Sequence, residues 1–173
     1  MAVGNLEFIK SASGTSVVSV DVTDCFSDKY DVYQVLITKS DVSAQDYSVL
    51  RLIDSGGSVI SANEYDYAEL GLLAYTTFGQ NKGTGVTSFP KVDVSGTSTA
   101  QGIGTMIYVF NPYDSSSYTF VAGQYSGVVA AGLAGGKHIG VHKVAEQITG
   151  IQLLRNNLNG VYDNLTVNVF GVK

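Results

Sequence analysis

Two histidines, His138 and His142, are the residues of this sequence best suited to hold a metal or to move a proton. They are four residues apart in a segment expected to form a strand, so both point to one face, about 13 Å apart. One chain therefore cannot bring both histidines to a single metal ion. A ring of histidines around a threefold axis could still hold a metal. We interpret the two residues as polar side chains on a solvent-facing surface.

The segment Ile53-Asp-Ser-Gly-Gly57 is similar to the sequence around the nucleophile of chymotrypsin-like proteases. That nucleophile needs a histidine base, which precedes it in the family, whereas both histidines here come after Ser55. Glycine supplies the backbone conformation of a tight turn, so we predict a turn at 54–57 that leads into Val59-Ile60. The sequence has no Gly-x-Ser-x-Gly, phosphate-loop or His-Glu-x-x-His motif.

Acidic residues come close together only as Glu64 with Asp66 and as Asp21 with Asp24. A glycosidase needs two carboxyl groups about 5 to 9.5 Å apart in a cleft. With few charged residues and no histidine beside them in the sequence, we interpret these residues as solvated acids. The single cysteine, Cys25, allows no disulfide or thiolate cluster within one chain, and we interpret it as a small apolar residue. We predict no enzymatic activity, no metal and no cofactor.

Tyrosines in or beside expected loops are candidates for contact with a partner, because tyrosine adds a large contact area at low entropic cost. Packing inside the fold is the more ordinary fate of each one. The long polar segment Asn111–Ser117 must lie at the surface, where its backbone is solvated or bound to a partner. The predicted surface-contact residues are Asn111, Tyr113, Asp114 and Tyr118, and the other tyrosines considered are Tyr65, Tyr67 and Tyr125.

The composition describes an acidic and weakly charged chain of 173 residues. Hydrophobic residues make up 45% of it and charged residues 14%, with a formal net charge of -5. Such a balance excludes disorder, and the lack of a basic cluster argues against nucleic acid as a partner. Residues 1–10 do not fit a signal peptide, and the longest apolar run, 127–136, is half the length of a membrane span.

Strands with period-two alternation are expected along the whole chain, because valine, threonine and tyrosine are frequent and glycine-rich turns separate them. Val18, Val20 and Val22 share one face of the clearest early strand, and Leu165, Val167 and Val169 share one face of the last. We predict a single all-β domain over 1–173, an antiparallel β-sandwich. The other expected strands are 33–38, 49–53, 105–110, 118–122, 138–142 and 148–154.

Two further segments complete the expected secondary structure. The segment 64–74 could form a short helix capped by Asn63, but Tyr65 and Tyr67 alternate and Gly71 weakens a helix, so we predict a strand. The segment Gly79–Gly85 is polar and rich in glycine, so we predict a surface loop.

The order of these segments resembles small virion proteins of tailed bacteriophages. The resemblance rests on Leu6–Lys10, the Tyr30-x-x-Tyr33 strand and the strand that runs into Gly56-Gly57. Near the end it rests on Ile148-Thr-Gly-Ile151, a turn at Asn159-Gly160 and the terminal Val-Phe-Gly-Val-Lys. Two departures are Asp163-Asn164, where the group usually has a glycine, and Phe170 in place of a tyrosine.

The resemblance implies a jelly-roll sandwich that forms a homotrimer on a virion assembled in the bacterial cytoplasm. A chain with so few charges has little polar material to cover a monomer, which also favours self-association. The expected function is a capsid decoration protein that binds the major capsid protein or another virion protein. The alternatives are a tail-fibre or receptor-binding module for a host glycan or receptor, and a free carbohydrate-binding module or glycan-cleaving enzyme. We expect neither a membrane nor nucleic acid as a partner.

Overall fold

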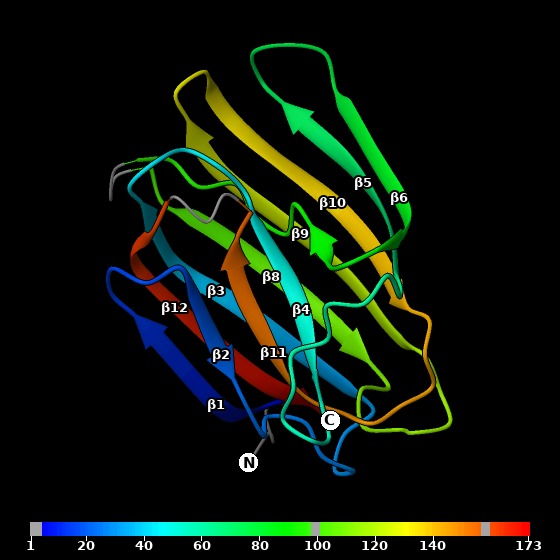
Figure 1. Cartoon of the computed structure of the whole chain (residues 1–173). Helices are drawn as coiled ribbons and strands as arrows, with labels where there is room; N and C mark the ends of the chain where they lie inside the picture. The colour runs from blue at the N-terminus through cyan, green and yellow to red at the C-terminus, as the bar shows by residue number, and fades with distance from the viewer. Residues whose placement is uncertain (1–4, 98–100, 157–159) are drawn as a thin grey trace.

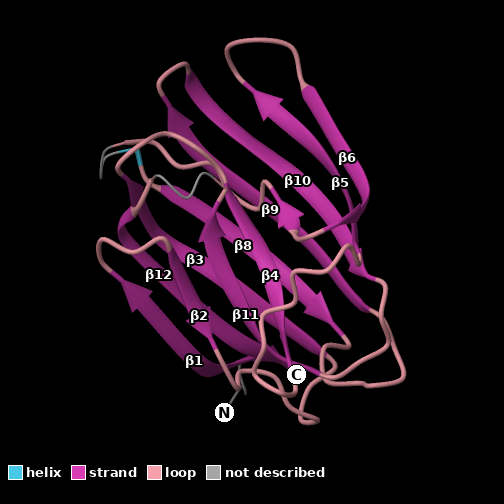
Figure 2. Ribbon diagram, in the orientation of Figure 1, coloured by secondary structure: helices cyan, strands magenta, loops and turns pink. Residues whose placement is uncertain are grey.

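The computed structural model describes residues 5–97, 101–156 and 160–173, and these form an all-β fold in which 63% of the described residues are in strands or isolated bridges. All described pairings between strands are antiparallel, as predicted (Figures 1 and 2). The strands are β1 Leu6–Gly14, β2 Ser19–Val22, β3 Val32–Val42, β4 Ser48–Asp54, β5 Tyr65–Leu73, β6 Gly79–Val86, β7 Phe89–Pro90, β8 Ile103–Phe110, β9 Thr119–Val129, β10 Gly132–His142, β11 Ile148–Arg155 and β12 Tyr162–Val172.

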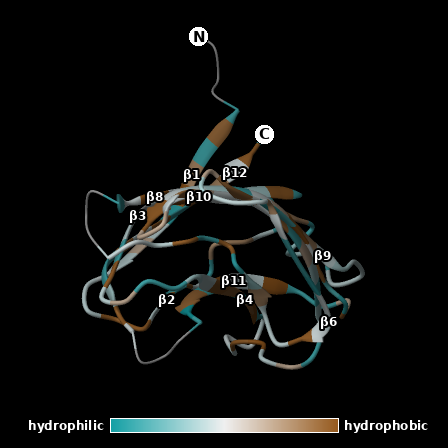
Figure 3. Cartoon of the chain, turned by 90° about the horizontal axis from the view of Figure 1, so that it is seen from above, coloured by the Kyte–Doolittle hydropathy of each residue, from teal (hydrophilic) through white to brown (hydrophobic). Residues whose placement is uncertain are grey.

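The strands form two sheets of unequal size. The larger has eight strands in the order β1-β12-β3-β8-β9-β10-β5-β6, and the smaller has four in the order β2-β11-β4-β7. Figure 3 shows the eight-stranded sheet arched over the smaller one, with β11 and β4 in its hollow. The sandwich is therefore confirmed. Its finer description as a jelly roll, and the extent of one domain over 1–173, stay predictions.

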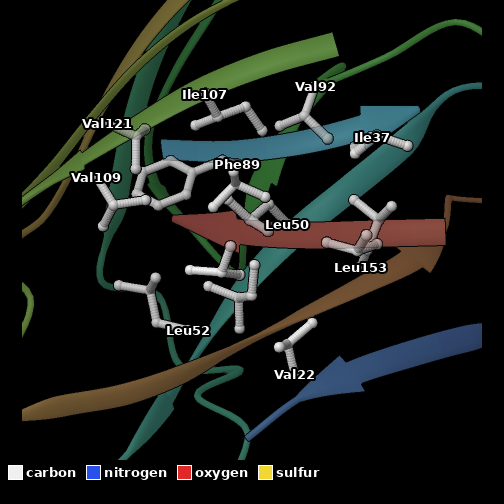
Figure 4. Close-up of a cluster of buried hydrophobic side chains, with 14 of the residues drawn as sticks. Val22, Ile37, Leu50, Leu52, Phe89, Val92, Ile107, Val109, Val121 and Leu153 are labelled. Atoms are coloured by element: carbon white, nitrogen blue, oxygen red, sulfur yellow. The ribbon is translucent and has the colours of Figure 1, made fainter. Parts of the chain in front are cut away.

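The core lies between the two sheets and follows the alternation of the strands. Val22 and Leu153 of the small sheet face Ile107 and Val121 of the large sheet, and all four are buried (Figure 4). On the last strand, Leu165, Val167 and Val169 are buried as predicted. Val20 and Val22 are buried too, whereas Val18 is exposed because it precedes β2.

The turn after β4 has the conformation that its sequence predicts. The Asp54 side chain accepts hydrogen bonds from the backbone N–H groups of Gly56 (2.8 Å) and Ser58 (2.9 Å). Gly57 has a φ of 80°, which favours glycine, and the chain then returns beside β4 through a bridge between Ile53 and Val59. Ser55 is therefore part of a hairpin turn.

The segment 64–74 forms a strand, as predicted. The prediction of a surface loop at Gly79–Gly85 is wrong. These residues form β6, the edge strand that pairs with β5 over Gly71↔Gly79 to Tyr65↔Val86. The error has a physical reason: an edge strand faces water on its open side, so it tolerates glycine and polar residues that a central strand excludes. The turn expected at Asn159-Gly160 lies partly outside the described residues.

Close packing joins the short β7 to the large sheet. A Cβ atom on Gly140 of β10 would lie 2.5 Å from the ring of Phe89, so only glycine lets this ring approach the strand. Phe89 also packs edge-on against Tyr65, with ring centroids 4.8 Å apart. The Tyr65 hydroxyl donates to the carbonyl of Ile60 (3.0 Å) and accepts from the N–H of Leu52 (3.2 Å). These contacts hold the two sheets together.

A buried polar cluster lies within the fold beside the small sheet. The Asp93 carboxylate accepts hydrogen bonds from the N–H (2.7 Å) and the hydroxyl (2.8 Å) of Ser48. The Tyr162 hydroxyl donates to the Ser48 hydroxyl (2.6 Å), and the Arg155 guanidinium lies 5.5 Å from the Tyr162 ring. All four residues are buried, so the cluster depends on mutual pairing. The buried Cys25 thiol stands apart from it, and burial raises the pKa of Cys25 to about 12.

Candidate functional site

The outer face of the eight-stranded sheet carries apolar side chains that no described residue covers. Ile139 is 62% exposed and Phe120 is 45% exposed, although both lie in the middle of the sheet. Strand register places Tyr108 beside Ala122 and Ala122 beside Ile139, and it pairs Phe110 with Phe120. We call the set Tyr108, Phe110, Phe120, Ala122, Ile139 and Val141 the outer apolar face.

This face contains a shallow groove of about 860 Å³. Phe110, Phe120 and Ile139 are among its apolar lining, and Asp66 and Lys82 contribute charges near the β5–β6 edge. Outward positions on a sheet exposed to water are usually polar, because alternation places the apolar residues in the core. Contiguous exposed apolar surface of this kind marks contact with another protein or with a ligand.

The predicted contact loop lies next to one end of this face. Asn111 donates its N–H to the carbonyl of Asp31 (2.7 Å), and Asp114 accepts from the N–H of Ser116 (2.8 Å), which fixes the loop. Asn111, Tyr113 and Asp114 line a cavity of about 220 Å³ together with Ser27, Asp28, Tyr30 and Asp31. Tyr118, which is 45% exposed, directly precedes β9, the strand that carries Phe120.

The tyrosines considered as contact residues divide between the core and the surface. Tyr65 and Tyr125 are buried, and Tyr67 and Tyr113 are half-buried against the core, so packing explains most of the set. Only Tyr118 among the five is largely exposed. The structure therefore brings Asn111, Tyr113 and Asp114 together around one cavity and leaves Tyr118 outside it.

A second cavity, of about 340 Å³, lies between the large sheet and the segments 45–47 and 91–94, and both polar and apolar side chains line it. We call it the polar cavity, after its acidic and amide groups. The Glu69 carboxylate accepts hydrogen bonds from the Tyr125 hydroxyl (2.7 Å) and the Asn81 amide (3.1 Å). The pKa of Tyr125 is raised mainly by burial and further by its hydrogen bond to Glu69. Tyr47, with the Lys91 ammonium 5.7 Å from its ring centroid, also lines this polar cavity.

Buried acids and aromatic rings give this polar cavity a defined chemistry. Besides Glu69, its lining includes Asp93, whose pKa burial raises to about 6. Carboxylates accept hydrogen bonds, and tyrosine rings offer flat apolar surfaces. A ligand rich in hydroxyl groups, such as a sugar, would satisfy both features.

The interpretation of the histidines as solvent-facing is wrong. His138 and His142 do share one face of β10, but it is the inner face, and both are buried. Burial lowers the pKa of His138 to about 4, so the ring is neutral at pH 7. Burial inside the chain also removes both rings from any threefold axis between copies. The error arose because glycines around them, such as Gly123 below the His138 ring, make room for an inward imidazole.

Comparison of this chain with known proteins identifies no relative. The chain matches no protein-family model, no curated protein and no solved structure. Among the described residues, the structure has no helix of the length and apolarity needed to cross a membrane. The class that the structure defines is thus an all-β sandwich with an exposed apolar sheet face and a polar cavity.

The sequence reasoning missed both the outer apolar face and the polar cavity. Phe120 and Ile139 could have been found as apolar residues at the polar positions of their alternating strands. The contact between Glu69 and Tyr125 joins residues 56 positions apart, so no local pattern in the sequence indicates it. Only the pairing order of β5, β10 and β9 brings them together.

Proposed function

We propose that this chain is a non-enzymatic structural protein of a bacteriophage virion, a homotrimeric capsid decoration protein on the outside of the head. The observation that carries the proposal is the outer apolar face, because a sheet centre with Ile139 62% exposed calls for a covering partner. The resemblance of the sequence to small tailed-phage virion proteins is the reason for proposing that the partner belongs to a virion.

In this proposal, copies of the chain cover one another's outer apolar face within the trimer. The loop Asn111–Ser117 and the adjoining Tyr118 contact the major capsid protein or another virion protein. Many copies on a lattice can each bind by modest contacts and still remain attached. The net charge of -5 suits a position outside the shell, away from packaged DNA.

Rebinding to particles stripped of this protein tests the proposal. We expect Tyr118→Ser to weaken rebinding by about tenfold or more, since an exposed tyrosine at an interface is a frequent energetic centre. Removal of residues 1–5, of which 1–4 lie outside the described part, is also expected to weaken it. Circular dichroism should show an unchanged fold for both variants.

Tyr75→Ser is the matched control, because Tyr75 is 44% exposed but lies in the β5–β6 connection, at the opposite end from the 111–118 loop (Figure 1). It should rebind like the unmodified protein. Tight binding to host cells, with no affinity for stripped heads, would overturn the head assignment in favour of a tail-fibre or receptor-binding module.

A second candidate function is glycan recognition, and the polar cavity favours it. In this case the chain is a receptor-binding module or a free carbohydrate-binding or glycan-cleaving protein, with Glu69 and Tyr47 in contact with a sugar. We expect a glycan array to show binding by the unmodified chain. Tyr47→Ala should weaken this binding at least tenfold, as the loss of one central aromatic residue does in protein interfaces. An array without any signal above background would remove this candidate.

A further inference from the structure

A cluster of one histidine and two glutamates lies where β10 ends. The Nε2 atom of His142 is 3.1 Å from a carboxylate oxygen of Glu64 and 3.6 Å from one of Glu146. One ligand atom from each of the three residues lies within 4.8 Å of the others. The imidazole is fully buried, whereas the two glutamate side chains are 34% and 32% exposed, so the cluster opens to solvent on its acidic side.

The backbone holds these three residues together from separate parts of the chain. His142 is the last residue of β10 and pairs with Tyr65, the first residue of β5, which places Glu64 beside the histidine. The N–H of Lys143 donates to the carbonyl of Glu64 (2.8 Å) and fixes this arrangement. The Tyr65 ring lies 5.0 Å from the imidazole, and Glu146 follows His142 by four residues.

The two separations from His142 lie close to those between ligands on one small cation. Ligand atoms about 2.0 to 2.1 Å from a metal lie about 2.9 to 3.4 Å apart in octahedral or tetrahedral geometry. The distances of 3.1 and 3.6 Å from His142 need only a small adjustment to meet this range. The two carboxylates together carry the charge that a divalent cation balances.

The charges around the cluster leave a need for such a cation. The nearby Lys143 ammonium binds the Asp66 carboxylate (2.9 Å). The charge of this lysine is therefore paired away from Glu64 and Glu146, which lie close together beside His142. Bringing Glu64 and Glu146 into one cluster thus has an electrostatic cost, which a bound cation would offset.

We propose that Glu64, His142 and Glu146 bind one divalent transition-metal ion, with Zn²⁺ as the representative ion. Imidazole nitrogen suits zinc and similar metals, whereas Mg²⁺ and Ca²⁺ prefer sites made of oxygen alone. Three protein ligands leave a position open to water. The Nδ1 atom of His142 has no hydrogen-bond partner among the described residues, so the site binds about 10- to 100-fold more weakly than one with a supported histidine.

A metal at this position would join the two connections that cross between the sheets at this end of the molecule. Glu64 lies in the connection from β4 to β5, and Glu146 lies in the connection from β10 to β11. Both connections lead from one sheet to the other. The ion would thus stabilise the folded chain, by an amount that rises with the logarithm of its concentration above the Kd. This inference is independent of the proposed virion function.

Titration of the tag-free chain with ZnCl₂, followed by calorimetry and by thermal unfolding, tests the site. We expect saturable binding of one Zn²⁺ per chain and a higher unfolding temperature, with no such response to MgCl₂ at equal concentration. Glu64→Gln and Glu146→Gln should each weaken Zn²⁺ binding by about tenfold or more, the scale of losing one supporting interaction or ligand. Both side chains are partly exposed, so these variants keep the fold.

Glu7→Gln is the matched control, because Glu7 has the same 34% exposure but pairs with Lys29 and Lys173 away from the cluster. It should bind Zn²⁺ like the unmodified chain. The proposal is overturned if the unmodified chain shows no saturable binding. It is also overturned if the two glutamine variants lose no more affinity than the control does.

Discussion

An Asp93→Ala variant is expected to lose about 3 kcal/mol or more of its free energy of unfolding, because it breaks a buried charged cluster. The substitution leaves the N–H and the hydroxyl of Ser48 without their acceptor. It also removes the negative charge that stands near the buried Arg155 guanidinium. Each unsatisfied buried donor costs about 1 to 3 kcal/mol. Urea unfolding followed by circular dichroism measures the loss.

Asp93→Asn is the conservative partner of this variant, since it keeps the shape and one acceptor oxygen. Burial raises the pKa of Asp93 to about 6 in the folded protein, above its ordinary 3.8. The folded chain therefore holds this proton more tightly, and the group's contribution to stability falls as the pH rises from about 4 to about 6. The stability of the asparagine variant relative to the unmodified protein should improve over that range. If Asp93→Ala lost less than about 1 kcal/mol of its free energy of unfolding, the buried cluster around Asp93 would not have the stabilising role described above.

A double variant, Phe120→Ser with Ile139→Ser, is expected to be monomeric under conditions in which the unmodified chain forms trimers. Both side chains point away from the core, so the fold should remain while the subunit contact is lost. Central interface residues commonly contribute about 2 kcal/mol or more each, which corresponds to an association weaker by about 1,000-fold for the pair. Sedimentation at micromolar concentration measures the change.

Phe78→Ser provides the comparison for this experiment. Phe78 is 68% exposed, more than either residue of the pair, but it lies in the β5–β6 connection outside the outer apolar face. Its replacement should leave the trimer intact. Equal association of the double variant and the unmodified chain, or a purely monomeric unmodified chain, would show that this face does not join subunits.

The strands were the most predictable part of the molecule, because burial on one side imposes a period of two. Leu165, Val167 and Val169 show this directly, since each is apolar and each is buried. Bounds were less predictable: the strand expected at 118–122 extends to Val129. Glycine and serine near its end, such as Gly127, look like turn residues in the sequence but lie within a paired hairpin.

The candidate sites were harder to predict, because they depend on contacts between distant strands. Glu64 and His142 are 78 residues apart, and nothing in the sequence around either one indicates the other. The loop Asn111–Ser117 could be placed at the surface because its polar residues follow a clear strand. That this loop lies beside the segment 27–31 could not be predicted, since the contact depends on the pairing of β3 with β8.

The strand order also constrains how the chain can fold as it is synthesised. β11 lies between β2 and β4, and β12 lies between β1 and β3, so in both sheets a strand made late lies between two strands made early. The first four strands leave the ribosome before their partners exist, and in each of them the edge that pairs with β11 or β12 must stay unpaired until residues 148–172 have emerged. Such long-range pairing is slow to form. Unpaired edges are also prone to associate wrongly, so the nascent chain passes through an aggregation-sensitive stage that the finished sandwich does not show.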